Sequence, residues 1–200
     1  MDTKLFYKIK KFDKNMDTVF ETKKIAANSF VIQYLQFMRY FTGQLTATIK
    51  NTAGNPTTIH YGGYSGSNPN GPKMDVAAAD NDSNYGIVVG SGTGTVTNQD
   101  YRLANQITHG LTTGLLDYGT QSSSTPIDHG TYISYQLARN FYNPTANPIT
   151  LNEIGIYCRA NQQYAATMYY YCLIHDLLVT PTIIGVDQTI AISYFIETQL

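Results

Sequence analysis

The feature that most constrains the fold of this chain is a series of strand-like segments that fills about the last ninety residues. These segments are rich in Tyr, Ile, Leu and Thr, and turns containing Asn, Pro and Gly separate them. The predicted strands are 115–121, 131–141, 149–159, 167–176 and 188–198. Strands at this spacing favour an antiparallel β-sandwich of the jelly-roll or Ig-like kind. Four prolines, which cannot donate a ladder hydrogen bond, fall between the segments: Pro126, Pro144, Pro148 and Pro181.

The first half of the chain adds one amphipathic helix to this β pattern. Six apolar residues recur at helical spacing, namely Phe30, Val31, Tyr34, Leu35, Met38 and Phe41. Asn28 or Ser29 is suited to cap the start and Gly43 to follow the end, so we predict a helix over 29–42. We expect its apolar stripe to pack on the sheet, and the alternative is a stripe that faces a partner. Strands are predicted at 45–50, from Thr57 onward, and at 87–89.

A second, shorter helix is predicted after the glycine-rich sequence GSGTGT at 90–95. The Thr97-x-x-Asp100 spacing fits a capping box, and His109-Gly110 ends the apolar pattern. Glycines between a strand and a helix resemble a phosphate-binding loop in position, but neither G-x-G-x-x-G nor G-x-x-x-x-G-K-[ST] is present. Backbone freedom is therefore the expected role of these glycines, with anion binding as the alternative.

Residues 1–27 are predicted to be an extended arm, and residues 28–200 a single domain. The first 24 residues hold seven of the thirteen basic residues against four acids, and Lys at both parities prevents the assignment of a strand face. The arm is either a solvated segment or a docking segment for an acidic partner. Its candidate assembly contacts are Lys4, Lys8, Lys10 and Lys11.

A long loop is predicted at 61–84, because Gly, Ser, Asn, Asp and Pro dominate it and few apolar groups are available to order it. We expect neighbouring chains to order this loop in an assembly. Its candidate contacts are Tyr61, Tyr64, Met74 and Val76.

No set of residues in the sequence indicates catalysis, a cofactor or a metal ion. The four histidines are scattered, and Glu occurs only at 21, 153 and 197. His175 and Asp176 are adjacent in a strand, so their side chains are expected on opposite faces. Cys158 and Cys172 lie in consecutive predicted strands, where they are able to face each other, but two buried free thiols are expected. The net charge of −1 argues against direct nucleic-acid binding, and no apolar run is long enough for a membrane span.

The composition favours packing against other proteins. Only 14% of residues are charged, below the ~25% of typical soluble domains, and there are 17 Tyr. Tyr is enriched at protein interfaces because it combines rigid apolar area with a polar tip.

Three phrases carry a resemblance to a known group of proteins: GIVVGSGTGTVTNQDYRLANQITHG at 86–110, PITLNEIGIY at 148–157, and YYYCLIHDLLVTPTIIGVDQTIAISYFI at 169–196. With NSFVIQYLQFM and the strand after it, they resemble poorly characterised structural proteins of tailed bacteriophages over residues 28–198. The resemblance implies a non-enzymatic virion component, made in the host cytoplasm, whose partners are other virion proteins and copies of itself. The alternative is a glycan- or receptor-binding module of a phage appendage, with Tyr170, Tyr171 and the long loop at 61–84 as an aromatic platform.

Overall fold

The computed structural model describes residues 2–27, 30–42, 46–60, 74–161 and 168–199. These residues form a mainly β protein with antiparallel sheets and one helix. The fold class predicted from the sequence is therefore confirmed at this level. No helix in the described ranges has the length and apolar character needed to cross a membrane.

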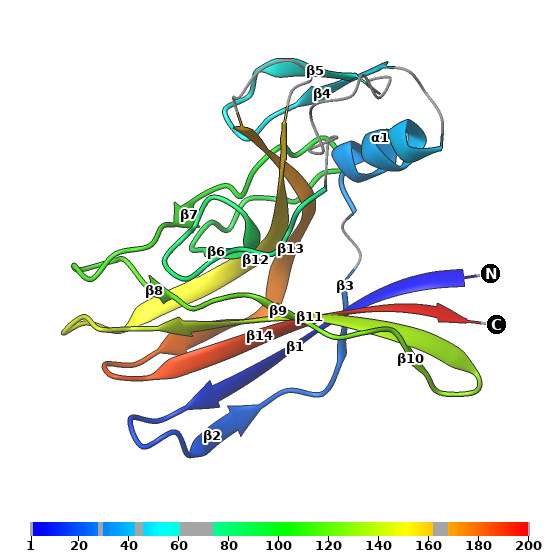
Figure 1. Cartoon of the computed structure of the whole chain (residues 1–200). Coiled ribbons are helices and arrows are strands. Elements are labelled where there is room, and N and C mark those ends of the chain that lie inside the picture. Colours follow the sequence, from blue (N-terminus) through cyan, green and yellow to red (C-terminus); the bar gives the residue numbers. More distant parts are fainter. Residues whose placement is uncertain (1, 28–29, 43–45, 61–73, 162–167, 200) are drawn as a thin grey trace.

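The larger sheet has the strand order β10-β11-β14-β1-β2, and every pairing in it is antiparallel. Its strands are β10 (Ile127–Asp128), β11 (Tyr132–Tyr142), β14 (Thr189–Gln199), β1 (Asp2–Phe12) and β2 (Thr18–Glu21). The short strand β3 (Ile25–Ala27) also pairs with β1. β8 (Asp117–Tyr118) and β9 (Ser122–Ser123) pair with β11. The two ends of the chain therefore lie side by side in one sheet (Figure 1).

The smaller sheet has the order β13-β12-β6-β7 and is built around a long hairpin. Its strands are β13 (Met168–Ile184), β12 (Ile149–Asn161), β6 (Gly86–Gly90) and β7 (Gln106–Ile107). The far end of the hairpin carries the helix α1 (Ile32–Phe41) and a third, two-stranded sheet of β4 (Thr46–Lys50) and β5 (Pro56–His60), as Figure 1 shows. The helix α1 contacts the hairpin through aromatic rings, since Phe37 and Tyr171 meet edge to face with ring centroids 5.2 Å apart.

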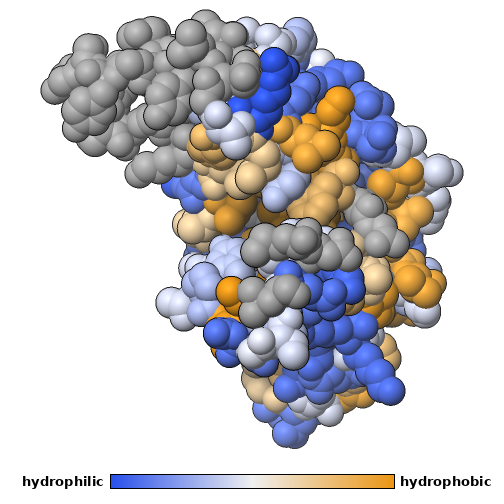
Figure 2. All heavy atoms as spheres, turned by 90° about the vertical axis from the view of Figure 1, so that its right-hand side faces the viewer, coloured by the Kyte–Doolittle hydropathy of each residue, from blue (hydrophilic) through white to orange (hydrophobic). Residues whose placement is uncertain are grey.

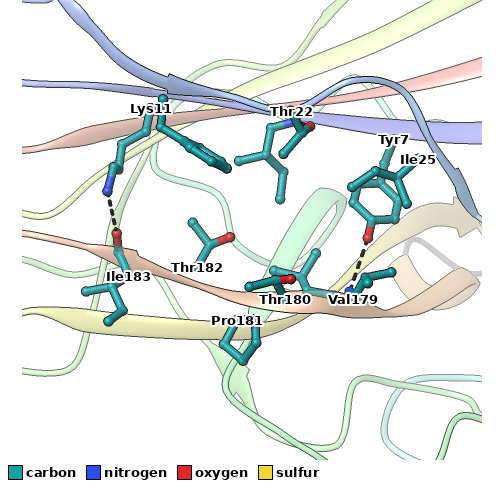
Figure 3. Close-up of a pocket in the computed structure, with 12 residues that line it drawn as sticks. Tyr7, Lys11, Thr22, Ile25, Val179, Thr180, Pro181, Thr182 and Ile183 are labelled. Atoms are coloured by element: carbon teal, nitrogen blue, oxygen red, sulfur yellow. Dashed lines mark hydrogen bonds between the residues drawn. The ribbon is translucent and has the colours of Figure 1, made fainter.

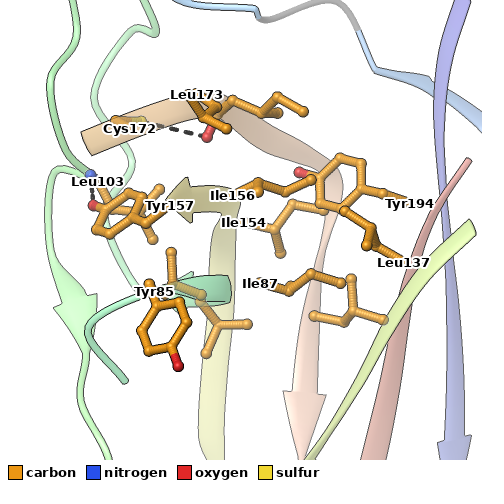
Figure 4. Packing of buried hydrophobic residues seen from close by; sticks show 14 of the residues in the cluster. Tyr85, Ile87, Leu103, Leu137, Ile154, Ile156, Tyr157, Cys172, Leu173 and Tyr194 are labelled. Atoms are coloured by element: carbon orange, nitrogen blue, oxygen red, sulfur yellow. Dashed lines mark hydrogen bonds between the residues drawn. The ribbon is translucent and has the colours of Figure 1, made fainter. Parts of the chain in front are cut away.

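The main core lies between the two larger sheets. Ile154 and Ile156 of β12 point toward Leu137 of β11 and Tyr194 of β14 (Figure 4). The Tyr194 hydroxyl also donates a hydrogen bond of 3.0 Å to Asp176 Oδ2 of β13. The segment 91–105 lies on the other face of the smaller sheet, where its N–H groups bond to Glu153 and Tyr157, and β6 is buried along its whole length. Burial on both faces explains why this strand is a continuous apolar run.

The prediction that residues 1–27 form an arm outside the folded domain is wrong for the described residues 2–27. All eleven residues of β1 pair with β14, and Leu5, Tyr7 and Ile9 are buried in the core. The apolar residues at odd positions make the core face of this strand. Lys11 is also at an odd position, at the end of the strand, so a charged residue follows the apolar ones on the same face. This exception concealed the alternation in the sequence.

The helix near the N-terminus is confirmed, with a different buried face from the one predicted. α1 begins after an N-cap at Val31 and ends before Thr42; Asn28, Ser29 and Gly43 lie outside the described residues. Its buried residues are Gln33, Phe37 and Tyr40, whereas Leu35, Met38 and Phe41 are exposed. Figure 2 shows apolar side chains in the upper part of the molecule, where α1 lies. Aromatic packing of Phe37 on the hairpin decides how the helix is rotated.

The second predicted helix is absent from the described segment 97–107, which consists of turns and β7. One capping-box contact nevertheless forms, because the N–H of Thr97 donates to Asp100 Oδ2 at 3.0 Å. The N–H groups of Ala104 and Asn105 donate to the Glu153 carboxylate at 2.9 and 2.7 Å. A helix would need these donors for its own carbonyl groups, so the tertiary contact replaces the helix.

Most predicted strands are confirmed, namely those at 45–50, from 57, and at 87–89, 131–141, 149–159 and 188–198. The segment 115–121 contains only the short β8, and β13 continues beyond the predicted end through Pro181 to Ile184. Glu153 of β12 pairs with Leu177, and Leu151 pairs with Thr182. Residues 178–181 of β13 therefore have no partner in β12, where only Asn152 lies between the two pairs. Pro181 lies in this bulge, where no ladder N–H is required.

The two cysteines are buried free thiols, as predicted. They do not face each other, because Cys158 pairs with Tyr171 and Cys172 pairs with Tyr157. Side chains directly opposite each other lie on the same face of a sheet, so the two thiols lie on opposite faces of β12–β13.

Candidate functional site

The only described histidine that joins two carboxylates lies on the outer face of the smaller sheet. His175 of β13 contacts Asp100 Oδ2 through Nδ1 and Glu153 Oε2 through Nε2, both at 2.8 Å. Each of the three phrases that carry the phage resemblance contributes one of these residues. No local pattern pointed to this cluster, because its members are separated by 22 to 75 positions.

Glu153 is fully buried and receives four hydrogen bonds. Besides His175, the N–H groups of Gly92, Ala104 and Asn105 donate to its carboxylate at 3.0, 2.9 and 2.7 Å. Burial by itself raises the pKa of Glu153, but His175 and the three N–H groups outweigh burial and lower the pKa. Burial likewise tends to lower the pKa of His175, and the two carboxylates raise it instead.

The cluster holds the segment 91–105 on the sheet. Both ring nitrogens of His175 are bonded and the residue is 2% exposed, so neither nitrogen is open to a substrate. As expected for adjacent strand residues, Asp176 bonds Tyr194 on the other face of the strand. The arrangement is suited to fastening a loop with charge-assisted hydrogen bonds.

The glycine-rich loop does bind an anion, and that anion is the chain's own Glu153. A Cβ at Gly90 would lie 2.4 Å from Glu153 Oε1, and a Cβ at Gly92 would lie 2.5 Å from the same atom. A Cβ at Gly94, by contrast, would meet no described atom within 4 Å. The first two glycines therefore supply space for the carboxylate, which is a requirement of packing.

We expect Gly92→Ala to lower the free energy of unfolding by about 1–3 kcal/mol, because the new methyl group displaces the Glu153 carboxylate from its donors. Gly94→Ala is the matched control and is expected to change stability by less than about 0.5 kcal/mol. Urea unfolding followed by circular dichroism measures both. Equal effects of the two substitutions would show that the close approach of Gly92 to the Glu153 carboxylate does not contribute to the free energy of unfolding.

The lysines predicted as assembly contacts lie on two faces of β1. Lys4, Lys8 and Lys10 are on the outer face, where Lys4 bonds Gln199 and Lys8 pairs with Glu21. Lys11 is on the inner face, at the end of a cleft between the two sheets. The structure does not bring the four lysines together into one patch.

The loop residues predicted as contacts are only partly described. Tyr61 and Tyr64 lie outside the described residues. Met74 and Val76 are half-buried and pack against the core of their own domain. Between them, Asp75 pairs with Arg159 at 2.8 Å. The described part of the loop, 74–84, is therefore held by its own domain, contrary to the expectation that neighbouring chains order it.

A cleft lies where the larger sheet and the bulge of β13 diverge (Figure 3). It has a volume of about 460 Å³. Two hydrogen bonds cross it, from Val179 N to the Tyr7 hydroxyl at 3.4 Å and from Lys11 Nζ to the Ile183 carbonyl at 3.3 Å. The other lining residues come from β1–β3 and β13: Ile9, Phe20, Thr22, Ile25, Leu178, Thr180, Pro181 and Thr182.

Large apolar side chains are exposed around the mouth of this cleft. Val179 is 78% exposed, Ile183 54% and Phe20 46%. None of the three was predicted from the sequence, since the predicted strand ends at 176 and Phe20 falls in the predicted arm. The available signal was a proline within the β-branched sequence VTPTII at 179–184, a pattern typical of a bulged edge strand.

The aromatic platform predicted for a glycan is not formed as expected. Tyr171 is fully buried, and its hydroxyl lies 2.7 Å from Thr57 Oγ1. Tyr170 is half-buried and stacks on Tyr85, with ring centroids 6.2 Å apart. Only one of the two tyrosines therefore has a surface that a sugar can reach.

Comparisons with protein-family models, curated proteins and solved structures give no match for this chain.

Proposed function

We propose that this protein is a structural or accessory component of a bacteriophage virion and acts through contacts with other protein chains. The observation that carries the proposal is the cleft with exposed Phe20, Val179 and Ile183 at its mouth. Large exposed apolar side chains gathered around one cleft are typical of protein interaction sites. The low charge and high Tyr content of the chain support the same conclusion.

The three phrases that resemble phage structural proteins meet in the buried cluster. Asp100, Glu153 and His175 come from the three resembling phrases, and their contacts fasten the segment 91–105 to the smaller sheet. The resembling residues thus build the framework of the fold. The two facing antiparallel sheets further support the finer proposal that the body is a β-sandwich of the jelly-roll or Ig-like kind.

The test is whether the chain is part of the particle. We expect density-purified particles to contain it at a constant copy number per genome, as measured by quantitative mass spectrometry. Cryo-EM of the same particles is expected to show its two sheets in contact with other virion proteins or with copies of itself. Absence from purified particles would refute the proposal, and selective binding of the purified chain to a glycan array would favour the receptor-binding alternative.

A further inference from the structure

We infer that the cleft between β1–β3 and the β13 bulge binds an extended, strand-forming segment of another protein. The segment carries apolar side chains at alternate positions and a carboxylate that reaches Lys11. This inference rests on the proposed function, because it names the kind of partner that the assembly contact takes.

Each wall of the cleft includes an edge strand. β2 is at the edge of the larger sheet and all four of its residues are exposed, and β13 is at the edge of the smaller sheet. Edge strands present unpaired N–H and C=O groups, to which an extended segment adds by backbone hydrogen bonds. Residues 178–181 of β13 also have no partner in β12. The backbone at this cleft is therefore suited to receive a further strand.

The floor of the cleft selects apolar side chains. Ile9 and Leu178 are 2% and 8% exposed, and Ile25 is half-buried beside them. Figure 3 shows side chains from β1–β3 and from β13 on the two sides of the gap. In a bound strand, every second side chain faces this floor and the others face the solvent. Alternating apolar residues are thus the pattern that fits.

The charge at one end of the cleft calls for an acidic group. Among the described residues, Lys11 Nζ has a hydrogen bond only to the Ile183 carbonyl, at 3.3 Å. Within the same part of the chain, no carboxylate pairs with Lys10, Lys11 or Lys14, whereas the neighbouring Lys8 pairs with Glu21. A partner carboxylate would give Lys11 a charge-assisted bond in place of its present long bond.

The bonds that now cross the cleft are easily exchanged. The bond from Lys11 to the Ile183 carbonyl is 3.3 Å long, and the bond from Val179 N to the Tyr7 hydroxyl is 3.4 Å long. Both exceed the usual range of about 2.7–3.2 Å, so both interactions are weak. An entering strand replaces them with ladder bonds and an ion pair. The two bonds across the cleft therefore do not prevent a strand from entering it.

The first experiment uses the purified full chain and three labelled eight-residue peptides in fluorescence anisotropy. One peptide alternates Val and Thr and ends in two Asp; the second ends in two Lys; the third has the Asp end but Pro in place of two Thr. We expect the first to bind at least tenfold more tightly than either of the others. Amide exchange at 178–183 is expected to slow when it binds.

Three variants assign the binding to the cleft. We expect Val179→Asp to weaken binding of the acidic peptide at least tenfold, and Lys11→Glu to reverse the preference between acidic and basic ends. Leu111→Asp is the matched control, since Leu111 is 65% exposed and does not line the cleft. Thermal unfolding by circular dichroism confirms that each variant is folded. Equal binding of all three peptides, or no binding, would overturn the inference.

The particle distinguishes this inference from the proposed function. A photo-crosslinking residue at position 179 is expected to mark an extended, acid-containing segment of another virion protein. A crosslink to a helix, or to a second copy of this chain through its own β2 or β13, would overturn the strand-binding inference while the virion assignment stands. Specific binding of the acidic peptide by a chain that is absent from particles would do the reverse.

Discussion

Replacing Arg139 with methionine is expected to lower the free energy of unfolding by about 3–5 kcal/mol, the largest effect that we predict for a single substitution. Arg139 of β11 is 1% exposed, and its guanidinium carbon lies 4.8 Å from the centre of the Tyr118 ring. It donates five hydrogen bonds of 2.6–3.1 Å, all to backbone carbonyls, which belong to Ala79, Asp82, Tyr85, Ile87 and Gly119. Methionine fills the volume but leaves these carbonyl groups without their donor.

Two further substitutions show whether the donors or the charge are responsible. Arg139→Lys keeps the charge but has three donors and no planar fork, so we expect it to recover only part of the loss. Arg102→Met is the control, because Arg102 is exposed, and we expect a change within about 0.5 kcal/mol. The chain has no Trp, so urea unfolding is followed by circular dichroism. Full stability of Arg139→Met would contradict the structural role of the five bonds.

Glu153→Gln is expected to lower the free energy of unfolding by about 3 kcal/mol. In the wild type, the N–H of Ala104 donates to Glu153 Oε2 at 2.9 Å. The amide of glutamine has only one acceptor oxygen, so its NH₂ group would face this N–H, and two donors cannot bond to each other. The substitution also removes the negative charge beside His175. Glu197→Gln is the matched control, because Glu197 forms a partly exposed pair with Lys24, and such pairs contribute about 1 kcal/mol or less.

The same cluster predicts how stability depends on pH. The pKa of Glu153 is lowered in the folded state, so its contribution is present above the ordinary value of 4.5 and is lost as the pH falls through the folded pKa. The pKa of His175 is raised, so its contribution is present below 6.5 and is lost as the pH rises through the folded pKa. We therefore expect the stability difference between the wild type and Glu153→Gln to be largest between pH 4.5 and 6.5.

The measurement is a series of urea unfolding curves for both proteins from acidic to alkaline pH. Glu197→Gln is expected to show no maximum in this window relative to the wild type. A difference that is independent of pH for Glu153→Gln would mean that the shape of the carboxylate, and not its charge, holds the segment 91–105.

Much of the fold was predictable from local patterns. The β-branched and aromatic segments at 131–141, 149–159 and 188–198 became long strands because their apolar content and flanking turns act over a few residues. The burial of both cysteines followed in the same way from the composition of their strands. The helix was also predictable, but its rotation was not, since the contact of Phe37 with Tyr171 involves a strand that is 134 residues away.

Other features depended on partners that are distant in the sequence. The capping pattern at Thr97–Asp100 predicted a helix, yet Glu153 takes the N–H groups that the helix needs. Residues 2–12 resembled an arm because their alternation is interrupted by Lys11, and only pairing with β14 shows that they belong to the sheet. Local propensity yields in these places because a buried carboxylate and a full ladder of backbone bonds each outweigh it.

The sequence by itself determined the class of the fold, the positions of most strands along the chain and the scarcity of charge, because these depend on composition and on periodicity within short segments. Only the tertiary structure decided the cluster of Asp100, Glu153 and His175, the carbonyl cage of Arg139 and the cleft beside Val179. Each of them is made by residues that no short window contains. Their geometry is set by strand register and by the packing of one sheet on the other, which a single sequence does not display.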